Sequence, residues 1–541
     1  MSEIKKSNFI KGAITLSAAG ILSKIMGFAY RIVLPRMIGA EGVGIYQLAY
    51  PIYTILLVIS TSGIPIALAK LISKEITNKD YRSAYSIFKT CKKLSIIVGL
   101  LLTFIMIVMA SPIIKTFNWD PRSIYSILAL APAVFFVTIM SSFRGFFQGL
   151  QNMVPTAYSQ IIEQFIRIIT MLLLVQLLLP YGIEFAAAGA TFGAVFGAIA
   201  GLILLIYIYL RKKNTIWEPL KQKTIKINDF WANSKKIIYL AAPITFGALI
   251  TPLMSFIDAA IVPARLQAAG FNNPLALYGH LTGMAMVLVH FPTIITLSLA
   301  TSLVPAISEA FTLSNQNLVQ SRAASALRLT ILIALPAAVG LYLLSNPLTT
   351  LIFGTPDAAI PLRFVAWGVI FISLKQTTAA MLQGMGKVII PARNLFIGAI
   401  FNAIINYTLT GLPYFGIRGA ALGTVTGFGV AAILNMYYVR KWTNLNFNYN
   451  KLLYKPIISV FIMSVAVLLS FKTIKLFLPT IIENYILIIS TFSAILLGIT
   501  VYSLTLLLLK EINYNDINLI PKIGPKLAEL LCKTPLLERE E

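Results

Sequence analysis

Long apolar segments recur along the whole chain, and they constrain its fold more than any other feature. Each is close to the ~20 residues that an α-helix needs to cross the hydrocarbon core of a bilayer. Because lipid offers no hydrogen bonds to the backbone, such segments must satisfy their own, as helices do. The sequence therefore predicts an all-α polytopic membrane protein with fourteen transmembrane helices. The predicted spans are 10–32, 44–69, 94–112, 123–143, 157–180, 185–210, 237–262, 276–308, 329–346, 358–384, 389–411, 418–439, 456–471 and 484–509.

The low charge content excludes an ordinary soluble enzyme and a disordered chain. Only 12% of the 541 residues are charged and 58% are hydrophobic, whereas soluble domains carry about 25% charged residues. Disordered chains combine low hydrophobicity with high charge. The basic residues 1–11 precede the first apolar segment as in a signal peptide, but Lys24 interrupts that segment and no small-residue cleavage site follows. We therefore expect an uncleaved first helix.

The positions of the basic residues predict the orientation of the chain. There are 44 Lys and Arg against 19 Asp and Glu, for a net charge of +25. With a cytoplasmic N-terminus, and with residues near the end of a span counted in the adjoining segment, 32 of the 44 fall in cytoplasmic segments, nine in outer segments and three deep within spans. Because cytoplasmic loops retain Lys and Arg, both termini are predicted to be cytoplasmic. This bias accounts for much of the basic charge without a nucleic-acid partner.

The segments between the spans are too short to hold a catalytic domain. The longest, 211–236, has about 26 residues, and the chain lacks a P-loop, an HExxH pair, a GxSxG elbow and a paired-carboxylate cluster. We therefore expect no enzymatic activity, no metal and no cofactor, and transport driven by an ion gradient, the membrane potential or the substrate's own gradient. Cys91 and Cys532 fall in predicted cytoplasmic segments, so no disulfide is expected.

Three pairs of motifs, 230 to 240 positions apart, indicate an internal duplication. Because each motif alone is short and common in membrane helices, the argument depends on their shared register. An offset of six helices preserves orientation, so the repeat is parallel. The pairs are TSGIP at 61–65 with TSLVP at 301–305, QG at 148–149 with QG at 383–384, and GATFG at 189–193 with GAALG at 419–423.

Two six-helix halves with a site between them are an architecture of transporters. The repeat therefore divides the chain into lobes, with two further helices after them. We predict an N-terminal six-helix lobe over 1–210, a cytoplasmic basic linker over 211–236, a C-terminal six-helix lobe over 237–440, extra helices 13 and 14 over 441–510 and a cytoplasmic tail over 511–541.

Cations in and beside the first predicted helix are candidate substrate-binding residues. Lys24 and Arg31 are seven residues apart and so share a helix face, and Arg36 follows near the predicted outer mouth. A charge inside the bilayer costs a few kcal/mol and is a functional candidate by default. Facing a cavity, unpaired cations suit an anionic substrate such as a phosphate. The alternative is that these side chains snorkel to the outer interface.

Two further predicted spans carry charges. Glu163 and Arg167 are spaced i, i+4, which favours a self-neutralising structural pair over a functional one. Lys375 has no acid nearby in sequence. Either it faces the same cavity as the cations of the first helix and binds substrate, or it pairs with Glu163.

Other polar residues in the spans have two interpretations each. Asp258 is either a coupling-cation ligand or an aspartate at the membrane interface, and the second is favoured. His280 and His290 either relay protons or are buried, hydrogen-bonded histidines, and again the second is favoured. Interhelical hydrogen bonds are expected for Asn402, Asn406 and Asn435.

Four motifs resemble one known superfamily, and the resemblance covers nearly the whole chain. They resemble the multidrug/oligosaccharidyl-lipid/polysaccharide (MOP) exporters, in the branch of the stage V sporulation protein B and lipid II flippase transporters. The motifs are SKIMGF at 23–28, GAEGVGIY at 39–46, SLVPAIS at 302–308 and LIPKIG at 519–524.

The resemblance implies a V-shaped, MATE-like fold with alternating access in the bacterial cell membrane. The implied substrate is a polyprenyl-diphosphate-linked oligosaccharide such as a lipid II-type peptidoglycan precursor, with spore cortex synthesis as one setting. The implied partners are this glycan, membrane lipid and envelope or sporulation biosynthetic proteins. Two other functions stay open: a cation-coupled multidrug exporter of the same superfamily, and a non-transporting envelope scaffold.

Lipid II flippases in this branch place cations from helices 1, 2 and 8 against the diphosphate. Only Lys24 matches that pattern cleanly here. Tyr30 stands where the family has its second cation in helix 1, with Arg31 one place later. Helix 2 has no cation before Lys70, and helix 8 carries histidines in place of an arginine. A diphosphate site in this chain would therefore be built differently.

Overall fold

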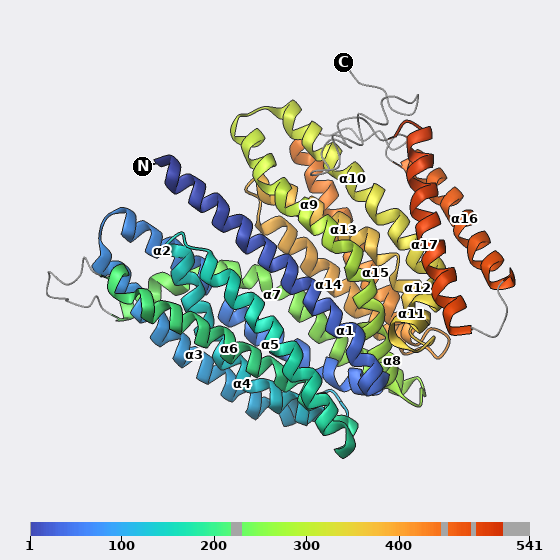
Figure 1. Ribbon diagram of the computed structural model, residues 1–541, viewed down its shortest axis with the longest axis horizontal. Helices are drawn as coiled ribbons and strands as arrows, with labels where there is room; N and C mark the ends of the chain where they lie inside the picture. The colour runs from blue at the N-terminus through green and yellow to red at the C-terminus, as the bar shows by residue number, and fades with distance from the viewer. Residues whose placement is uncertain (1, 218–229, 445–452, 478–482, 512–541) are drawn as a thin grey trace. The chain divides into compact units, whose positions relative to one another are not determined.

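Helices are the only regular elements in the part of the chain that the computed structural model describes, which comprises residues 2–217, 230–444, 453–477 and 483–511 (Figure 1). Every predicted span overlaps one of them. The α-helices are α1 Ser2–Thr61, α2 Ile64–Thr77, α3 Tyr81–Thr116, α4 Ser123–Gly149, α5 Val154–Leu178, α6 Ile183–Ile216, α7 Phe230–Ala268, α8 Pro274–Gly279, α9 Met286–Thr312, α10 Gln316–Leu343, α11 Ser345–Phe353, α12 Ala359–Val365, α13 Gly368–Gly384, α14 Ile389–Thr410, α15 Ile417–Thr443, α16 Lys455–Phe477 and α17 Glu483–Leu508.

The first predicted span and most of the second lie in a helix that is interrupted at one residue, and the second span continues across residues 62–63 into α2. α1 has 60 residues, which at 1.5 Å per residue is about 90 Å, or three times the thickness of a hydrocarbon core. At Gly39 the backbone leaves the helical region, with φ 66° and ψ 179°. Glycine adopts this positive φ without the steric cost that a Cβ would impose. The expected connection between the two spans is therefore helical on both sides of a single kink.

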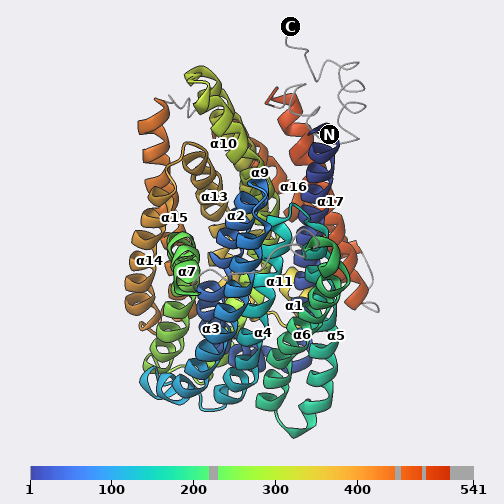
Figure 2. The same ribbon diagram turned by 90° about the vertical axis from the view of Figure 1, so that its left-hand side faces the viewer.

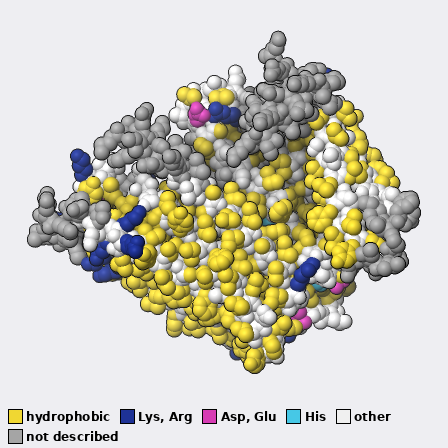
Figure 3. All heavy atoms as spheres, in the orientation of Figure 1, with side chains coloured by type: hydrophobic (Ala, Val, Ile, Leu, Met, Phe, Trp, Pro, Cys, Tyr) yellow, Lys and Arg dark blue, Asp and Glu magenta, His cyan; other side chains and the backbone are white. Residues whose placement is uncertain are grey.

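The described helices confirm a polytopic all-α membrane protein. Twelve are long and apolar enough to cross a membrane, and the count becomes thirteen if the bent pair α12 and α13, which meet at 42°, forms one span. A total of fourteen spans stays a prediction. Figure 3 shows hydrophobic side chains over most of the visible face. Large exposed side chains such as Phe104, Leu177 and Phe461 are expected where the surrounding solvent is lipid.

The helices form two compact units, of which the first comprises residues 1–284 and 403–420. In this unit α3, α4, α5 and α6 pack in sequence-neighbouring pairs, and α4 also packs against α6 (Figures 1 and 2). Buried aromatic rings fill the end of this bundle where α6 finishes. Phe88 stacks on Phe146 with ring centroids 4.2 Å apart, and Tyr209 and Trp217 contact Phe146 at 5.6 and 5.7 Å.

The second unit comprises residues 285–402 and 421–541. α9, α10 and α13 pack together around buried residues that include Leu303, Leu327 and Met381. α16 and α17 pack against each other and against α10, where the Tyr502 hydroxyl donates to the Leu332 carbonyl at 2.9 Å. Two buried asparagines link α14 and α15, since Asn394 donates to Asn435 at 2.9 Å. That bond confirms the predicted interhelical role of Asn435. The same prediction is wrong for Asn402, whose buried side-chain nitrogen and oxygen have no hydrogen-bond partner among the described residues.

Close helix contacts in the motifs support the predicted duplication. Gly149 of one QG motif packs against α2, and Gly384 of the other packs against α9. Likewise Gly189 packs against the end of α5 and Gly419 against the end of α14, in each case the preceding helix. The two compact units have different bounds from the lobes that the repeat predicts. The two-lobe division, with its linker and its extra helices, therefore stays a prediction.

Several predicted features fall outside the described residues. They are part of the basic linker (218–229), the LIPKIG motif (519–524) and Cys532. Cys91 is described, and it is buried as a free thiol in α3.

Candidate functional site

A row of tyrosines on α1 forms one wall of a buried polar region in the first unit. Tyr46, Tyr50 and Tyr53 follow one another at spacings of four and three, which places them on one helix face. Their rings are in contact, with centroids 5.6 and 5.8 Å apart. Across the Gly39 kink, the Tyr30 hydroxyl lies 3.5 Å from that of Tyr46. The kink thus brings the tyrosines of both halves of α1 together.

Three charged side chains from α4 and α5 lie against this wall. Arg144 Nη2 donates to Glu163 Oε2 at 2.8 Å, and Arg167 Nη2 donates to Glu163 Oε1 at 2.6 Å. Arg144 Nε also donates to the Ser159 hydroxyl at 3.0 Å. The three charged side chains are only 13–17% exposed. The two carboxylate oxygens each accept from a different arginine, so the charges form a triad.

The triad lines a cavity of about 260 Å³ together with Tyr50 and Tyr53. Two arginines against one glutamate leave a net charge of +1 at the cavity. Arg167 Nε is buried and has no hydrogen-bond partner among the described residues. A buried, unpaired N–H that carries positive charge is costly unless something accepts from it. The arrangement is therefore suited to an anionic acceptor.

A glycine in α6 permits the helix packing that supports the triad. A Cβ at Gly197 would lie 2.5 Å from the Glu163 carbonyl oxygen and 2.9 Å from the Arg167 Cβ. Real Cβ atoms do not approach backbone oxygens so closely, so only glycine fits. The close approach presses α6 against the turn of α5 that carries Glu163 and Arg167. It thereby fixes where those two side chains emerge.

The predicted cations of α1 differ in their surroundings. Arg31 is half-buried and its Nε lies 3.4 Å from the Tyr30 hydroxyl, which places it beside the tyrosine wall. Lys24 and Arg36 are exposed. Lys24 lies one turn before Gly27, where α1 meets Gln164 of α5. The structure thus brings Arg31 close to the tyrosines, whereas Lys24 does not line the cavity.

Lys375 lies in the second unit, half-buried on α13. Its ammonium sits over the ring of Phe428, 5.1 Å from the centroid, which is a cation–π distance. Glu163, the alternative partner predicted for Lys375, has both of its carboxylate oxygens bonded to Arg144 and Arg167.

The remaining polar candidates fall around α7, α8 and α9. Asp258 is half-buried and accepts a 2.6 Å hydrogen bond from Asn406, which confirms the interhelical role predicted for that asparagine. His280 is buried and His290 is exposed. Among the described residues, no group of three or more His, Cys, Asp and Glu side chains is placed to hold a metal ion.

Sequence reasoning missed Arg144 and the tyrosine wall. The predicted span 123–143 leaves Arg144 in a cytoplasmic connection, yet it lies inside α4, five residues before its end. The apolar run Phe143 to Phe147 that surrounds it was the available signal for a continuing helix. The spacing of Tyr46, Tyr50 and Tyr53 was equally visible, but nothing in it distinguished a site from a packed helix face.

Two family models match the chain. The model described as "Polysaccharide biosynthesis protein" matches residues 9–311, and the MatE model matches residues 243–408. The first match alone spans more than half of the chain.

Two relatives from Bacillus subtilis (strain 168) match most of the chain. Stage V sporulation protein B is 31% identical, over 81% of this chain and 84% of the relative. Lipid II flippase MurJ is 29% identical, over 87% of this chain and 89% of the relative.

Solved structures of the MOP superfamily share the fold. An inward-facing multidrug resistance MATE family transporter matches with a TM-score of 0.65 at 17% identity, over 80% of this chain and 98% of that one. A MOP superfamily transporter from Pyrococcus furiosus matches with a TM-score of 0.54 at 16% identity, over 81% and 96%. At these identities the likeness shows a MATE-like fold.

Proposed function

Because the chain belongs to the polysaccharide biosynthesis protein family of the MOP superfamily, we propose that it is a flippase for a polyprenyl-diphosphate-linked oligosaccharide. It carries the charged head group across the bacterial cell membrane by alternating access while the lipid tail stays in the bilayer. The finer proposal is a peptidoglycan precursor of the lipid II type, in the setting of spore cortex synthesis. The relatives named for sporulation and for lipid II support this choice.

The net-cationic cavity of the first unit is the observation that carries the proposal. A diphosphate is an anion with several acceptor oxygens, and arginine binds phosphate through paired N–H groups. Arg144 and Arg167 exceed the charge of Glu163 by one, and Arg167 Nε has no partner among the described residues. In a site of low polarity, a surplus cation favours an anionic ligand more strongly than it would in water.

The other cations are proposed to extend this site. Lys24, Arg31 and Arg36 of α1 are proposed to guide the diphosphate to and from the cavity, since Arg31 already borders the tyrosine wall. Lys375 is proposed to contact substrate from the second unit. The tyrosine hydroxyls at the cavity, each both a donor and an acceptor, suit phosphate oxygens and sugar hydroxyls.

The energy source is proposed to be an ion gradient, the membrane potential or the substrate's own gradient. Glu163, Asp258, His280 and His290 are the candidate coupling groups. Of these groups, the Asp258 carboxylate accepts a hydrogen bond from the Asn406 amide on another helix. A change in the charge of Asp258 would therefore be felt by both helices.

A cation-coupled multidrug exporter is the second candidate, favoured by the likeness to MATE structures. Exporters of organic cations need acidic side chains in their cavity. The cavity of the first unit has the opposite balance, with two arginines and one glutamate. An envelope scaffold, the third candidate, has no use for that surplus charge.

The test is rescue of a bacterium depleted of its essential lipid II flippase. Wild-type protein, Lys24→Ala and Arg167→Gln are expressed to equal membrane abundance. Rescue is expected from the wild type, and loss of rescue is expected from Lys24→Ala and from Arg167→Gln, which makes the triad neutral. Arg322→Gln is the matched control, because Arg322 pairs with Glu309 at an exposed site in the second unit.

The same strains separate the candidates. Failure of well-expressed wild type would argue against lipid II as the substrate, and drug resistance conferred on a sensitive host would support the multidrug exporter. Full rescue by Arg167→Gln would refute the role given to the cavity.

A further inference from the structure

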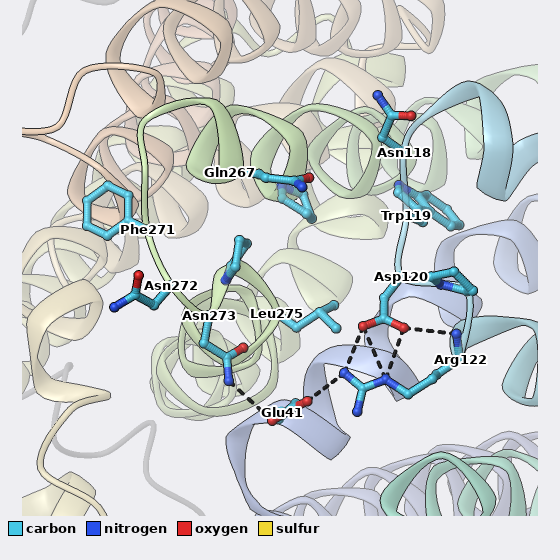
Figure 4. A pocket seen from close by; sticks show the side chains of 13 residues that line it. Glu41, Asn118, Trp119, Asp120, Arg122, Gln267, Phe271, Asn272, Asn273 and Leu275 are labelled. Atoms are coloured by element: carbon cyan, nitrogen blue, oxygen red, sulfur yellow. Dashed lines mark hydrogen bonds and ion pairs between the residues drawn. The ribbon is translucent and has the colours of Figure 1, made fainter.

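A second polar pocket in the first unit is formed where three connections meet. It has a volume of about 460 Å³ and lies at the α1 kink, the α3–α4 connection and the α7–α8 connection (Figure 4). Volumes of 300–1,000 Å³ are typical of small-molecule sites. The orientation predicted from the basic residues places all three connections on the outer side of the membrane. The triad cavity described above has a separate set of lining residues.

An ion-pair network forms one side of the pocket. Arg122 donates to both carboxylate oxygens of Asp120, at 2.7 to 3.2 Å, and to Glu41 Oε1 at 2.6 Å. The second oxygen of Glu41 accepts from Asn273 at 3.2 Å. Asn273 in turn caps α8, accepting from the Ala276 amide at 3.0 Å. The carboxylate oxygens of Asp120 and Glu41 are bonded to protein partners. The network therefore supports one side of the pocket and is a poor metal site.

Close packing of the α1 and α8 backbones holds this ion-pair network in place. A Cβ at Gly44 would collide with the Leu275 carbonyl, and a Cβ at Gly279 would collide with the Ala40 carbonyl. α1 and α8 therefore approach more closely than larger residues would permit. That approach brings Glu41 against Asn273.

Three amide side chains around the pocket have unused hydrogen-bonding groups. Asn118 follows α3, Gln267 lies in the last turn of α7, and Asn272 lies in the connection to α8. All three are exposed, and none has a side-chain hydrogen bond to another described residue. Each amide offers one acceptor oxygen and two N–H donors. Figure 4 shows Gln267 directed toward the middle of the pocket, with Asn118 and Asn272 at its edge and directed away from the ion-pair network.

Two aromatic side chains complete the lining. Trp119 is buried, and its Nε1 donates to the Ala259 carbonyl at 2.9 Å, which fixes the indole. Phe271 is packed over Gly416, where a Cβ would collide with the ring. Trp119 is only 3% exposed and supports the wall from behind, whereas the Phe271 ring is half-buried. An aromatic ring beside unused amides suits a ligand that has both apolar C–H faces and many hydroxyls. A sugar ring is such a ligand.

We propose that this pocket binds the saccharide part of the transported glycan on the outer side of the membrane. The proposal rests on the proposed function, because it is that function which presents a glycan at this face. Uncharged amides and satisfied carboxylates favour a neutral polyhydroxyl ligand over a phosphate or a metal ion. A saccharide held here would stabilise the head group after it leaves the cationic cavity.

The experiment measures binding of free saccharides to the full-length protein in lipid nanodiscs. The probes are chitotetraose and maltotetraose, and the readout is saturation-transfer NMR with titration of the saccharide. Saturable binding of at least one probe is expected. Gln267→Ala combined with Asn272→Ala should weaken it about tenfold, because each lost hydrogen bond to a ligand is worth a few-fold in affinity.

The controls distinguish binding at a specific site from unfolding of the protein and from non-specific adsorption of the saccharide. Asn214→Ala removes an exposed amide at the end of α6, far along the chain from the pocket, and should leave binding unchanged. Thermal unfolding of every variant is measured in the same nanodiscs. Spermidine, an organic cation, is tested as a third probe. Equal saccharide binding by the wild type and the double variant would overturn the proposal. Binding of spermidine by a protein that binds neither saccharide would also overturn it.

The outcome is independent of the transport test. If lipid-linked glycan is translocated but neither saccharide binds, the pocket proposal is wrong and the proposed function stands. If saccharide binds at the pocket but no lipid-linked glycan is translocated, the proposed function is wrong and the pocket keeps its ligand class.

Discussion

Arg144 of α4 and Glu163 of α5 are joined by a 2.8 Å ion pair, although they lie 19 positions apart in the chain. This contact changes the meaning of the i, i+4 pair that Glu163 forms with Arg167. A self-neutralising pair would leave no charge for a substrate. The third side chain gives the cavity a net positive charge while every carboxylate oxygen remains bonded.

Replacing Arg144 tests whether the surplus charge serves transport. Arg144→Gln leaves Glu163 bonded to Arg167 and makes the cavity neutral. We expect the rate of lipid-linked glycan translocation in proteoliposomes to fall at least about tenfold, since hydrogen bonds to charged groups are worth roughly 1.5–3 kcal/mol. Arg144→Lys keeps the charge and should lose less. Equal rates for Arg144→Gln and wild type would separate transport from the triad.

Glu163 is expected to hold the triad together. In Glu163→Gln, two arginines would remain partly buried without a counter-charge. We expect the free energy of unfolding to fall by roughly 3 kcal/mol, as when one partner of a buried ion pair is removed. The measurement is thermal unfolding in detergent. Glu309→Gln breaks the exposed pair with Arg322 and should cost less than about 1 kcal/mol; similar losses in both variants would contradict this role.

Gly197 is expected to tolerate no side chain. In Gly197→Ala the added Cβ would meet the Glu163 carbonyl, so α6 must move away from α5. Overpacking of this kind costs about 1–3 kcal/mol. Gly247→Ala in α7 is the matched control, because no atom lies within 4 Å of its Cβ. It should be neutral or slightly stabilising, as alanine favours helix over glycine. A lowered melting temperature for Gly197→Ala alone is the expected result.

Asp120 in the outer pocket makes stability depend on pH at the acidic end. Burial raises the pKa of this carboxyl, but hydrogen bonds from the Arg122 side chain and backbone outweigh it and hold the pKa below its ordinary value. The carboxylate therefore stabilises the folded state fully above its unfolded pKa of about 3.9. This contribution is lost as the pH falls through the lower, folded pKa.

The corresponding measurement compares melting temperatures of wild type and Asp120→Asn from pH 7 to pH 3. The difference between the two proteins should be largest near neutral pH and should shrink below about pH 4. Asn118→Ala removes a non-titrating side chain of the same pocket, so its effect should stay constant. An Asp120→Asn difference that is unchanged at pH 3 would show that the ion pair with Arg122 contributes nothing.

The fold could be predicted from the sequence because a bilayer imposes a length and a composition on every span. The predicted segments therefore overlap helices throughout the described residues. Gly39 was harder to interpret, since one non-helical residue suffices for the kink in α1. The apolar spans 10–32 and 44–69 leave it in a connection, and nothing local distinguishes a short loop from a kinked helix.

The site was less predictable because its geometry depends on contacts between helices. Glu163 and Arg167 form the pair that their spacing predicts. Their partner Arg144 is set by how α4 packs on α5, which sequence periodicity does not contain. The outer pocket is similar, since Glu41, Arg122 and Asn273 come from three connections that only the packed unit brings together.

The orientation of the chain can be tested with two matched cysteine variants. The excess of Lys and Arg predicts that Asn272, in the α7–α8 connection, lies outside, and that Asn78, at the end of α2, lies inside. Both side chains are exposed. In intact cells, a membrane-impermeant maleimide should label Asn272→Cys at once and Asn78→Cys only after permeabilisation. Both variants and their background are made in Cys532→Ser protein, whose remaining cysteine, Cys91, is buried. The reverse pattern would place the saccharide pocket on the cytoplasmic side, where it would meet the glycan before translocation.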